Sequence, residues 1–231
     1  MQSGPSGERP ALRTYGRRRG RRLSARQQRL LAHELPKVAI DLSAPPPTAL
    51  AGLFGRHLSD VWLEIGFGDG SHLLWQAERN PEIGIIGCEP FLDGVVKVLS
   101  VLEHGRLRNV RLHAGDAREL LVWLPAGSIG RLFVLFPDPW PKRRHGKRRL
   151  LGPAILPILA RAMRPAAELH IATDSGDYVR TILLAAAGEP NLVWLAAGPQ
   201  DWRGWSWPPT KYQRKALAEG RRCYFLTFRR R

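Results

Sequence analysis

The sequence alternates between short apolar segments of strand character and longer amphipathic segments of helix character, and this alternation restricts the possible folds. The strand-like segments are residues 61–66, 83–89, 110–115, 129–136, 169–173, 192–197 and 223–228. The helix-like segments are residues 71–78, 92–104, 117–123, 149–163 and 178–187. Strands alternating with helices predict an α/β fold with a doubly wound, mostly parallel sheet of seven strands. No clear crossover helix separates the last two strands, so we expect an antiparallel hairpin there.

The first 50 residues differ in composition from the rest. Residues 1–29 are rich in Gly, Ser and Arg, and they cannot bury enough apolar surface to offset the cost of ordering. A short helix is expected in ARQQRLLAHEL, residues 25–35, and the prolines at 45–47 mark a linker. We therefore expect a basic, largely flexible arm and linker over residues 1–50 and a folded catalytic domain over residues 51–231.

Residues 132–150, LFVLFPDPWPKRRHGKRRL, combine a buried-strand pattern with a stiff turn and a basic run. The apolar run ends at Pro137, whose missing N–H and fixed φ cannot continue a ladder, so Asp138 lies just beyond a strand end. Six cations follow within residues 142–149. Ligands of open α/β sheets bind beyond the carboxyl ends of the strands, so a functional carboxylate and a phosphate-binding loop are predicted. The alternative is that Asp138 caps the next segment and the cations form a solvated face.

Positive charge is clustered along the chain, whose net charge is +16. Residues 1–29 hold nine arginines against one glutamate, residues 142–149 hold six cations, and residues 221–231 hold five arginines. Such clusters indicate a polyanionic partner, and nucleic acid is the expected one. An anionic membrane surface is the alternative, but no amphipathic apolar face accompanies the Arg run.

Other features bear on location and on metals. The chain has no run of about twenty apolar residues and no secretory pattern, so we expect a soluble, cytoplasmic protein without a membrane partner. Cys88 and Cys223 lie in separate apolar runs, which favours buried thiols in a reducing compartment over a disulfide. Neither Cys-x-x-Cys nor paired His spacing occurs, so no metal site is predicted.

The segment VWLEIGFGDGSHLL ends the first strand of the domain and begins its first helix. Gly66, Gly68 and Gly70 have the spacing G-x-G-x-G, and glycine lets the backbone turn tightly and approach a ligand. Glu64 lies inside the strand, and Glu89 ends the next strand. A strand-end acid accepts hydrogen bonds from both hydroxyls of a ribose, which predicts a nucleotide-like cofactor. For Glu64 the alternative is a strand acid paired with a buried backbone group.

Ribose recognition alone fits NAD as well as S-adenosylmethionine. The turn lacks the G-x-G-x-x-G pyrophosphate fingerprint. Asp116, in HAGDA after the third strand, is placed to meet an adenine amino group. A methyl donor carries an amino-acid portion and a sulfonium and has no pyrophosphate, which suits a site rich in acids. The residues therefore favour S-adenosylmethionine over an NAD-dependent oxidoreductase.

Five segments occur in the order LEIGFGDG, GCEPF, FPDPWPKRRHGKRR, ATDSGDY and PPTKYQRKA. Together they resemble the bacterial tRNA (guanine-N7-)-methyltransferases, in particular alphaproteobacterial members, over about residues 25–231. The resemblance implies a class I S-adenosylmethionine-dependent fold. It also implies methylation at N7 of the guanine at position 46 in the tRNA variable loop, forming 7-methylguanosine. Separately, we expect a monomer or weak homodimer. A non-catalytic RNA-binding protein on this scaffold is the rival interpretation.

The resemblance also assigns roles to residues. The cofactor-site acids, beside the three glycines, are Glu64, Glu89, Asp116 and Asp138, and Asp138 also matches the family's proposed catalytic residue. The substrate-contacting positions are Lys142, Asp174, Thr210, Lys211, Tyr212 and Gln213. The family usually has an acid in place of Gln213 and a polar residue in place of Gly146. The Gln213 amide can still hydrogen-bond a base edge, and Gly146 is expected to loosen the basic loop.

Guanine N7 has an available lone pair, so no base is needed before attack and catalysis is expected to rest on positioning. Positive charge passes to the guanine ring as the methyl moves, and Asp138 is placed to hold the N1 and N2 donors and stabilise that charge. Asp174 is a second candidate for that edge. Lys142 and its neighbouring arginines are expected to bind phosphates without reading sequence. Trp140 and Tyr212 are candidate stacking platforms for a displaced base, with core packing as the alternative.

Overall fold

The computed structural model describes residues 20, 22–202 and 204–231. The strands are β1 (Asp60–Ile65), β2 (Ile83–Cys88), β3 (Val110–His113), β4 (Ile129–Leu135), β5 (Met163–Thr173), β6 (Leu192–Trp194) and β7 (Tyr224–Arg230). The helices are α1 (Ala25–Arg29), α2 (Leu35–Val38), α3 (Ser71–Arg79), α4 (Leu92–Leu102), α5 (Ala117–Trp123), α6 (Leu156–Ala162), α7 (Gly176–Ala187) and α8 (Lys211–Ala218).

The strands form one sheet in the order β3-β2-β1-β4-β5-β7-β6. The first five strands in that order are parallel, and β7 is antiparallel to both β5 and β6. The predicted doubly wound sheet with C-terminal antiparallel strands is therefore confirmed, but β6 and β7 are joined by a long connection that contains α8 and do not form a hairpin. Ile65 pairs with Cys88 on one side, and β4 pairs with β1 up to Val134 on the other. The carboxyl ends of β1, β2 and β4 thus stop at nearly the same level.

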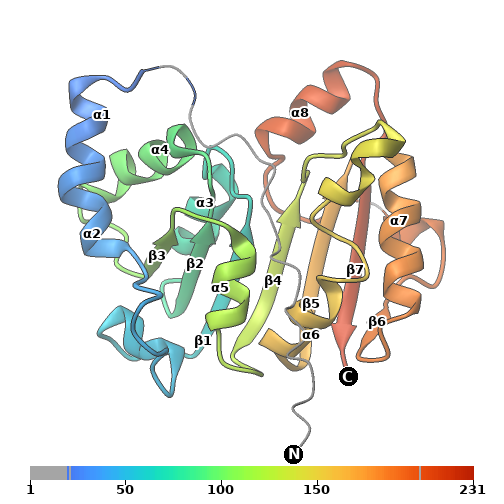
Figure 1. Ribbon diagram of the computed structural model, residues 1–231, viewed down its shortest axis with the longest axis horizontal. Helices are drawn as coiled ribbons and strands as arrows, with labels where there is room; N and C mark the ends of the chain where they lie inside the picture. Colours follow the sequence, from blue (N-terminus) through green and yellow to red (C-terminus); the bar gives the residue numbers. More distant parts are fainter. Residues whose placement is uncertain (1–19, 21, 203) are drawn as a thin grey trace, which may run out of the picture.

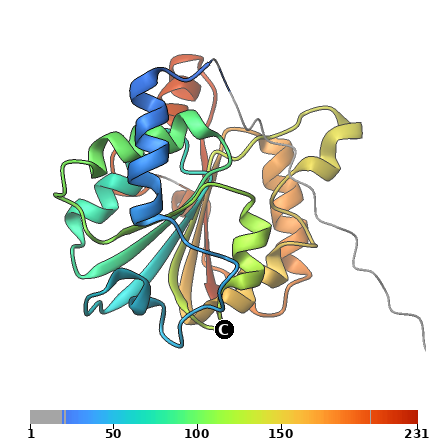
Figure 2. The same cartoon turned by 60° about the vertical axis from the view of Figure 1, so that its left-hand side comes forward.

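Helices cover both faces of the sheet, with α3 and α4 on one side and α5, α6 and α7 on the other (Figure 1). The turned view in Figure 2 shows the sheet between these two layers. Leu63 and Leu132 belong to the core beneath α5–α7, and their neighbours Trp62 and Phe133 belong to the core beneath α3 and α4. Successive strand residues point to opposite faces, so these continuous apolar strands are buried on both sides.

The N-terminal segment packs on the edge of the domain beside α4 (Figure 1). α1 and α2 are joined by a π-helical turn, Leu30–Glu34, whose first residue is buried in the α3–α4 core. The Ile40 N–H donates to the Leu112 carbonyl of β3 at 2.9 Å. Part of the segment expected to act as linker thus contacts the sheet edge. Residues 1–19 and 21 of the expected arm lie outside the described residues.

Three elements differ from the sequence prediction. The helix predicted over residues 149–163 is wrong for its first half, because Gly152 and Pro153 hold a turn there and the helix starts only at Leu156. β5 then begins directly at Met163. α8 was not predicted, and Thr210 caps it.

Within the part of the chain that the structure describes, no helix is long and apolar enough to cross a membrane.

Candidate active site

The glycine turn after β1 forms as its spacing predicts. Gly66, Gly68 and Gly70 have φ of 73°, 58° and 78°, a left-handed conformation that residues with a Cβ rarely adopt. The Gly66 N–H donates to the Cys88 carbonyl at 2.7 Å, which ties the turn to the end of β2. A Cβ on Gly94 of α4 would lie 2.1 Å from the Gly68 carbonyl oxygen, so this helix packs directly against the turn. The turn is thereby held between β2 and α4.

Glu89 follows β2 and is fixed by backbone donors. The Gly68 N–H donates to its Oε2 at 2.8 Å, and the Phe91 N–H donates to its Oε1 at 2.9 Å. Burial raises the pKa of Glu89, the two N–H groups oppose that rise, and the nearby carboxylates of Asp138 and Glu64 add to it. The acid is thus held in one orientation beside the glycine turn, with lone pairs left on both oxygens.

Asp116 follows β3 and caps α5. Its Oδ1 accepts the Arg118 N–H at 2.9 Å, and the Arg118 guanidinium lies 3.3 Å from Oδ2. Only 4% of Asp116 is exposed. A buried carboxylate with a charged partner is a fixed hydrogen-bond acceptor at this strand end.

Asp138 lies in a turn with an unusual backbone. Phe136 and Trp140, on either side of it, have φ of 53° and 42°, and such left-handed conformations cost non-glycine residues on the order of 1–3 kcal/mol each. The Phe136 N–H donates to the Ala172 carbonyl at 2.7 Å, which joins the start of the turn to β5. Asp138 itself is exposed, and no residue that the structure describes forms a hydrogen bond or ion pair with its carboxylate.

One cavity of about 420 Å³ joins these strand ends. Among the residues predicted from the sequence, those that line it are Gly66, Gly68, Glu89, Asp116, Asp138, Lys211 and Tyr212. Phe91, Asp93, Arg118, Trp140 and Arg148 line it as well. Its volume lies within the range of small-molecule sites, which is about 300–1,000 Å³. The structure therefore gathers acids from three strand ends around one space.

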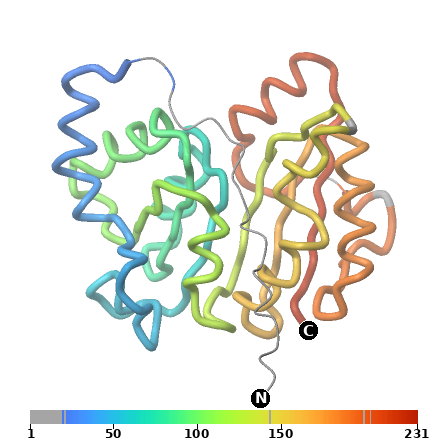
Figure 3. Tube along the Cα trace, in the orientation of Figure 1, coloured from blue at the N-terminus to red at the C-terminus, as the bar shows by residue number. Residues whose placement is uncertain are grey.

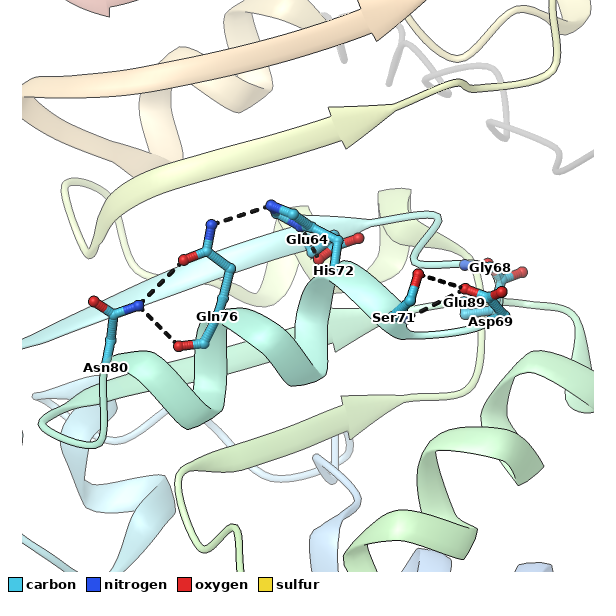
Figure 4. A network of polar contacts seen from close by, with 8 residues as sticks. All are labelled: Glu64, Gly68, Asp69, Ser71, His72, Gln76, Asn80 and Glu89. Atoms are coloured by element: carbon cyan, nitrogen blue, oxygen red, sulfur yellow. Dashed lines mark hydrogen bonds and ion pairs between the residues drawn. The ribbon is translucent and has the colours of Figure 1, made fainter. Parts of the chain in front are cut away.

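Glu64 does not line this cavity. It is 3% exposed, and the His72 Nδ1 lies 2.8 Å from its Oε2. Figure 4 shows the network continuing along α3, from the His72 ring to Gln76 at 3.1 Å and from Gln76 to Asn80. Gly70, also absent from the cavity wall, is the N-cap of α3. The structure thus places Glu64 and Gly70 behind the turn, where they hold the start of α3.

The cations of the basic loop whose side chains the structure describes have different surroundings. Lys142, Arg144 and Lys147 are exposed. Arg148 is half-buried on the cavity wall, with its guanidinium 4.9 Å from the centre of the Trp140 ring. The Arg149 side chain is only 8% exposed and pairs with Asp177 of α7. Arg149 is therefore buried against the protein, whereas the expected phosphate binding by Lys142 and its neighbouring arginines needs exposed side chains.

Three further predicted residues, Asp174, Thr210 and Gln213, do not line the cavity. Asp174, at the end of β5, forms an ion pair with Arg221. The Thr210 hydroxyl caps α8 by accepting the Gln213 N–H at 3.2 Å, and neither of these two residues lines the cavity. A Cβ on Gly68 would lie 3.2 Å from the Tyr212 ring, which is therefore close to the glycine turn. Figure 3 traces α8 and the basic loop at the same end of the sheet.

Some cavity residues were missed by sequence reasoning. Asp69 sits inside the glycine spacing, and Asp93 lies in the first turn of the helix after Glu89, so both had a positional signal. Arg118, two residues after Asp116, had the same kind of signal. No sequence signal separates Arg148 from its basic neighbours, because its position on the cavity wall depends on how the basic loop folds back over the cavity.

The residues fit S-adenosylmethionine. The cavity meets a glycine turn that is hydrogen-bonded to the end of β2 and to Glu89, and it carries acids suited to a ribose diol, an adenine amino group and a cationic sulfonium. Glu89, Asp116 and Asp138 are the residues that would hold these groups. No group of three or more His, Cys, Asp or Glu in the described ranges is placed to hold a metal ion.

The sheet order and the acids at its strand ends define the class of the protein, which is an α/β S-adenosylmethionine-dependent methyltransferase. A family model described as "Putative methyltransferase" matches residues 59–226. Relatives named tRNA (guanine-N(7)-)-methyltransferase are 44% identical in Rhodopseudomonas palustris BisA53, covering 94% of this chain and 87% of the relative, and 46% identical in Rhodospirillum rubrum, covering 95% and 88%. The chain therefore belongs to the tRNA (guanine-N(7)-)-methyltransferase family.

Solved structures support the fold. The 16S rRNA methyltransferase KamB aligns with a TM-score of 0.55 and 19% identity, covering 81% of this chain and 95% of that protein. The tRNA (m1A58) methyltransferase TrmI of Aquifex aeolicus aligns with a TM-score of 0.50 and 15% identity, covering 79% and 66%. At these identities the likeness is one of architecture.

Proposed function

We propose that the protein transfers a methyl group from S-adenosylmethionine to N7 of the guanine at position 46 in the tRNA variable loop. The observation that carries the proposal is the position of Asp138. Its carboxylate has no partner among the described residues, and Asp138 lines the cavity together with Gly66, Gly68, Glu89 and Asp116. The names of relatives that are 43–47% identical support the same activity.

S-adenosylmethionine supplies an electrophilic methyl group on a sulfonium. Glu89 and Asp116 orient the donor, because each carboxylate is buried and fixed by N–H donors. Asp138 accepts from the N1 and N2 donors of guanine and stabilises the positive charge that develops on the ring. N7 has its own lone pair, so Asp138 removes no proton before attack. Positioning therefore supplies most of the catalysis.

The basic loop delivers the tRNA. Lys142, Arg144 and Lys147 are exposed and bind phosphates. Tyr212 and Trp140 line the cavity and serve as stacking surfaces for the displaced base. Lys211 and Gln213 contact the substrate from α8.

Other assignments complete the proposal. Asp174 and Thr210 also contact the substrate. Before tRNA binds, Asp174 is paired with Arg221, and the Thr210 hydroxyl accepts the Gln213 N–H at the start of α8. Residues 1–50 act as a basic arm and linker, and residues 51–231 form the catalytic domain. The protein acts in the cytoplasm as a monomer or weak homodimer.

The proposal is tested with unmodified tRNA transcript and S-adenosylmethionine carrying a labelled methyl group. We expect one label per tRNA at the variable-loop guanosine, and no label when 7-deazaguanosine replaces that nucleotide. Transfer to the 7-deaza transcript would overturn the N7 assignment. Titration with S-adenosylhomocysteine separates the enzyme from a pure RNA-binding protein, since the latter has no reason to bind it.

A further inference from the structure

Arg149 is a cation of the basic loop whose side chain is buried against α7. Its Nε donates to the Pro139 carbonyl at 2.8 Å, one residue after Asp138. Its Nη1 donates to the Thr181 hydroxyl at 2.6 Å, and its Nη2 pairs with the Asp177 carboxylate. One guanidinium therefore joins the Asp138 turn to α7.

The α7 side of this junction is anchored in the core. The Arg149 guanidinium lies 5.0 Å from the centre of the Tyr178 ring, and Tyr178 is fully buried. The Leu151 N–H donates to the Tyr178 hydroxyl at 2.8 Å. The Arg149 side chain and the Leu151 backbone are thus both hydrogen-bonded to one turn of α7. This makes α7 a rigid anchor for the segment.

The turn that carries Asp138 needs such an anchor. Phe136 and Trp140 hold left-handed conformations that persist only where the surroundings enforce them. The Phe136 N–H is held by the Ala172 carbonyl at 2.7 Å, which fixes the start of the turn. The Arg149 bond to Pro139 holds the other end.

We propose that Arg149 is a positioning residue that keeps the Asp138 carboxylate aimed into the cavity by tying its turn, and the end of the basic loop, to α7. This inference rests on the proposed function, because it assigns Arg149 to the same reaction. Arg149 contacts neither substrate nor cofactor and acts through Asp138. A lysine would keep the charge, but a single ammonium lacks the planar fork that reaches three acceptors in different directions.

The test compares Arg149→Lys and Thr181→Val with Arg180→Lys, an exposed control on the same helix. We expect Arg149→Lys to lower kcat on the order of tenfold, because small misplacements of a catalytic group are costly, while KM for tRNA and affinity for S-adenosylhomocysteine change less than twofold. Thr181→Val should lower kcat in the same direction by less. In an Asp138→Asn background, Arg149→Lys should cost less than twofold. An equal loss in both backgrounds would overturn the inference.

Hydrogen exchange supplies a readout that needs neither tRNA nor cofactor. Amides of residues 138–151 should exchange at least tenfold faster in Arg149→Lys than in the wild type or in Arg180→Lys, with an unchanged melting temperature. Unchanged exchange in this segment would overturn the inference even if activity fell. Faster exchange in a protein that does not methylate N7 would support the anchoring role and refute the proposed function instead.

Discussion

Glu89 accepts the Gly68 N–H at 2.8 Å, so the acid after β2 and the glycine turn after β1 form one unit. Hydrogen bonds to charged groups contribute about 1.5–3 kcal/mol, and Glu89 makes two with backbone donors. Substituting Glu89 therefore disturbs the turn as well as the site. The effects of substitutions at the glycine turn and at Glu89 are therefore not expected to be independent.

Glu89→Gln is expected to weaken S-adenosylhomocysteine binding tenfold or more, because an amide has one acceptor oxygen where a carboxylate has two. Burial raises the pKa of Glu89, so the wild-type affinity should fall at mildly acidic pH as the carboxylate takes up a proton. The variant should lack this pH dependence. Calorimetric titration at several pH values measures both effects, and equal affinity of the two proteins would refute the role.

His170 should make stability depend on pH. Burial, with Arg131 and His72 nearby, lowers its pKa to about 3, although the Glu168 carboxylate lies 3.3 Å from Nε2. The unfolded chain, with a His pKa of about 6.5, binds the proton more tightly, so stability is lost as pH falls from 6.5 toward 3. His170→Gln should reduce the loss of unfolding free energy between pH 7 and pH 5 by about 2 kcal/mol, as measured by urea unfolding. A slope identical to that of the wild type would contradict this.

The Glu64–His72 pair should matter for stability. His72→Leu leaves the buried Glu64 carboxylate without its 2.8 Å partner, at a cost of about 2 kcal/mol. Adding Glu64→Gln should recover part of that cost. Urea unfolding of the single and double variants measures the coupling, and strictly additive effects would show that the pair is not coupled.

Arg144 and Arg149 should differ in tRNA binding. Arg144→Gln should lower the slope of log affinity against log salt by about 1, as expected for one lost phosphate contact. Arg149→Gln should leave the slope unchanged, because the Arg149 side chain is 8% exposed and faces α7. Arg79→Gln, on the far end of α3, is the matched control. An equal fall in slope for Arg144→Gln and Arg149→Gln would contradict the assignment of phosphate binding to Arg144 and of a buried role to Arg149.

The sequence predicted the sheet and the strand-end acids because alternating elements and acids after apolar runs are local patterns. Glu89 follows β2 directly, Asp116 and Asp138 lie three residues beyond the ends of β3 and β4, and parallel strands bring their ends together. The orientation of Glu64 was not predictable in this way. Its side chain points toward α3, and that depends on how the helix returns over the sheet.

Arg149 shows the same limit within the basic loop. Nothing local separates it from Arg148, since its burial depends on Asp177 and Thr181, which lie about thirty residues further along the chain. α8 was missed because its signal is a Thr cap on a mostly polar segment. The burial of Arg149 thus depends on contacts between segments that are distant in the sequence, which local patterns do not reveal.

The most direct test of the account is the single-turnover rate of Asp138→Asn on unmodified tRNA. An amide keeps the shape but carries no charge to stabilise the developing cation, so the rate should fall about 100-fold. Affinity for S-adenosylhomocysteine should stay within twofold of the wild type. A wild-type rate with 7-methylguanosine formed at the same position would contradict the central role of Asp138.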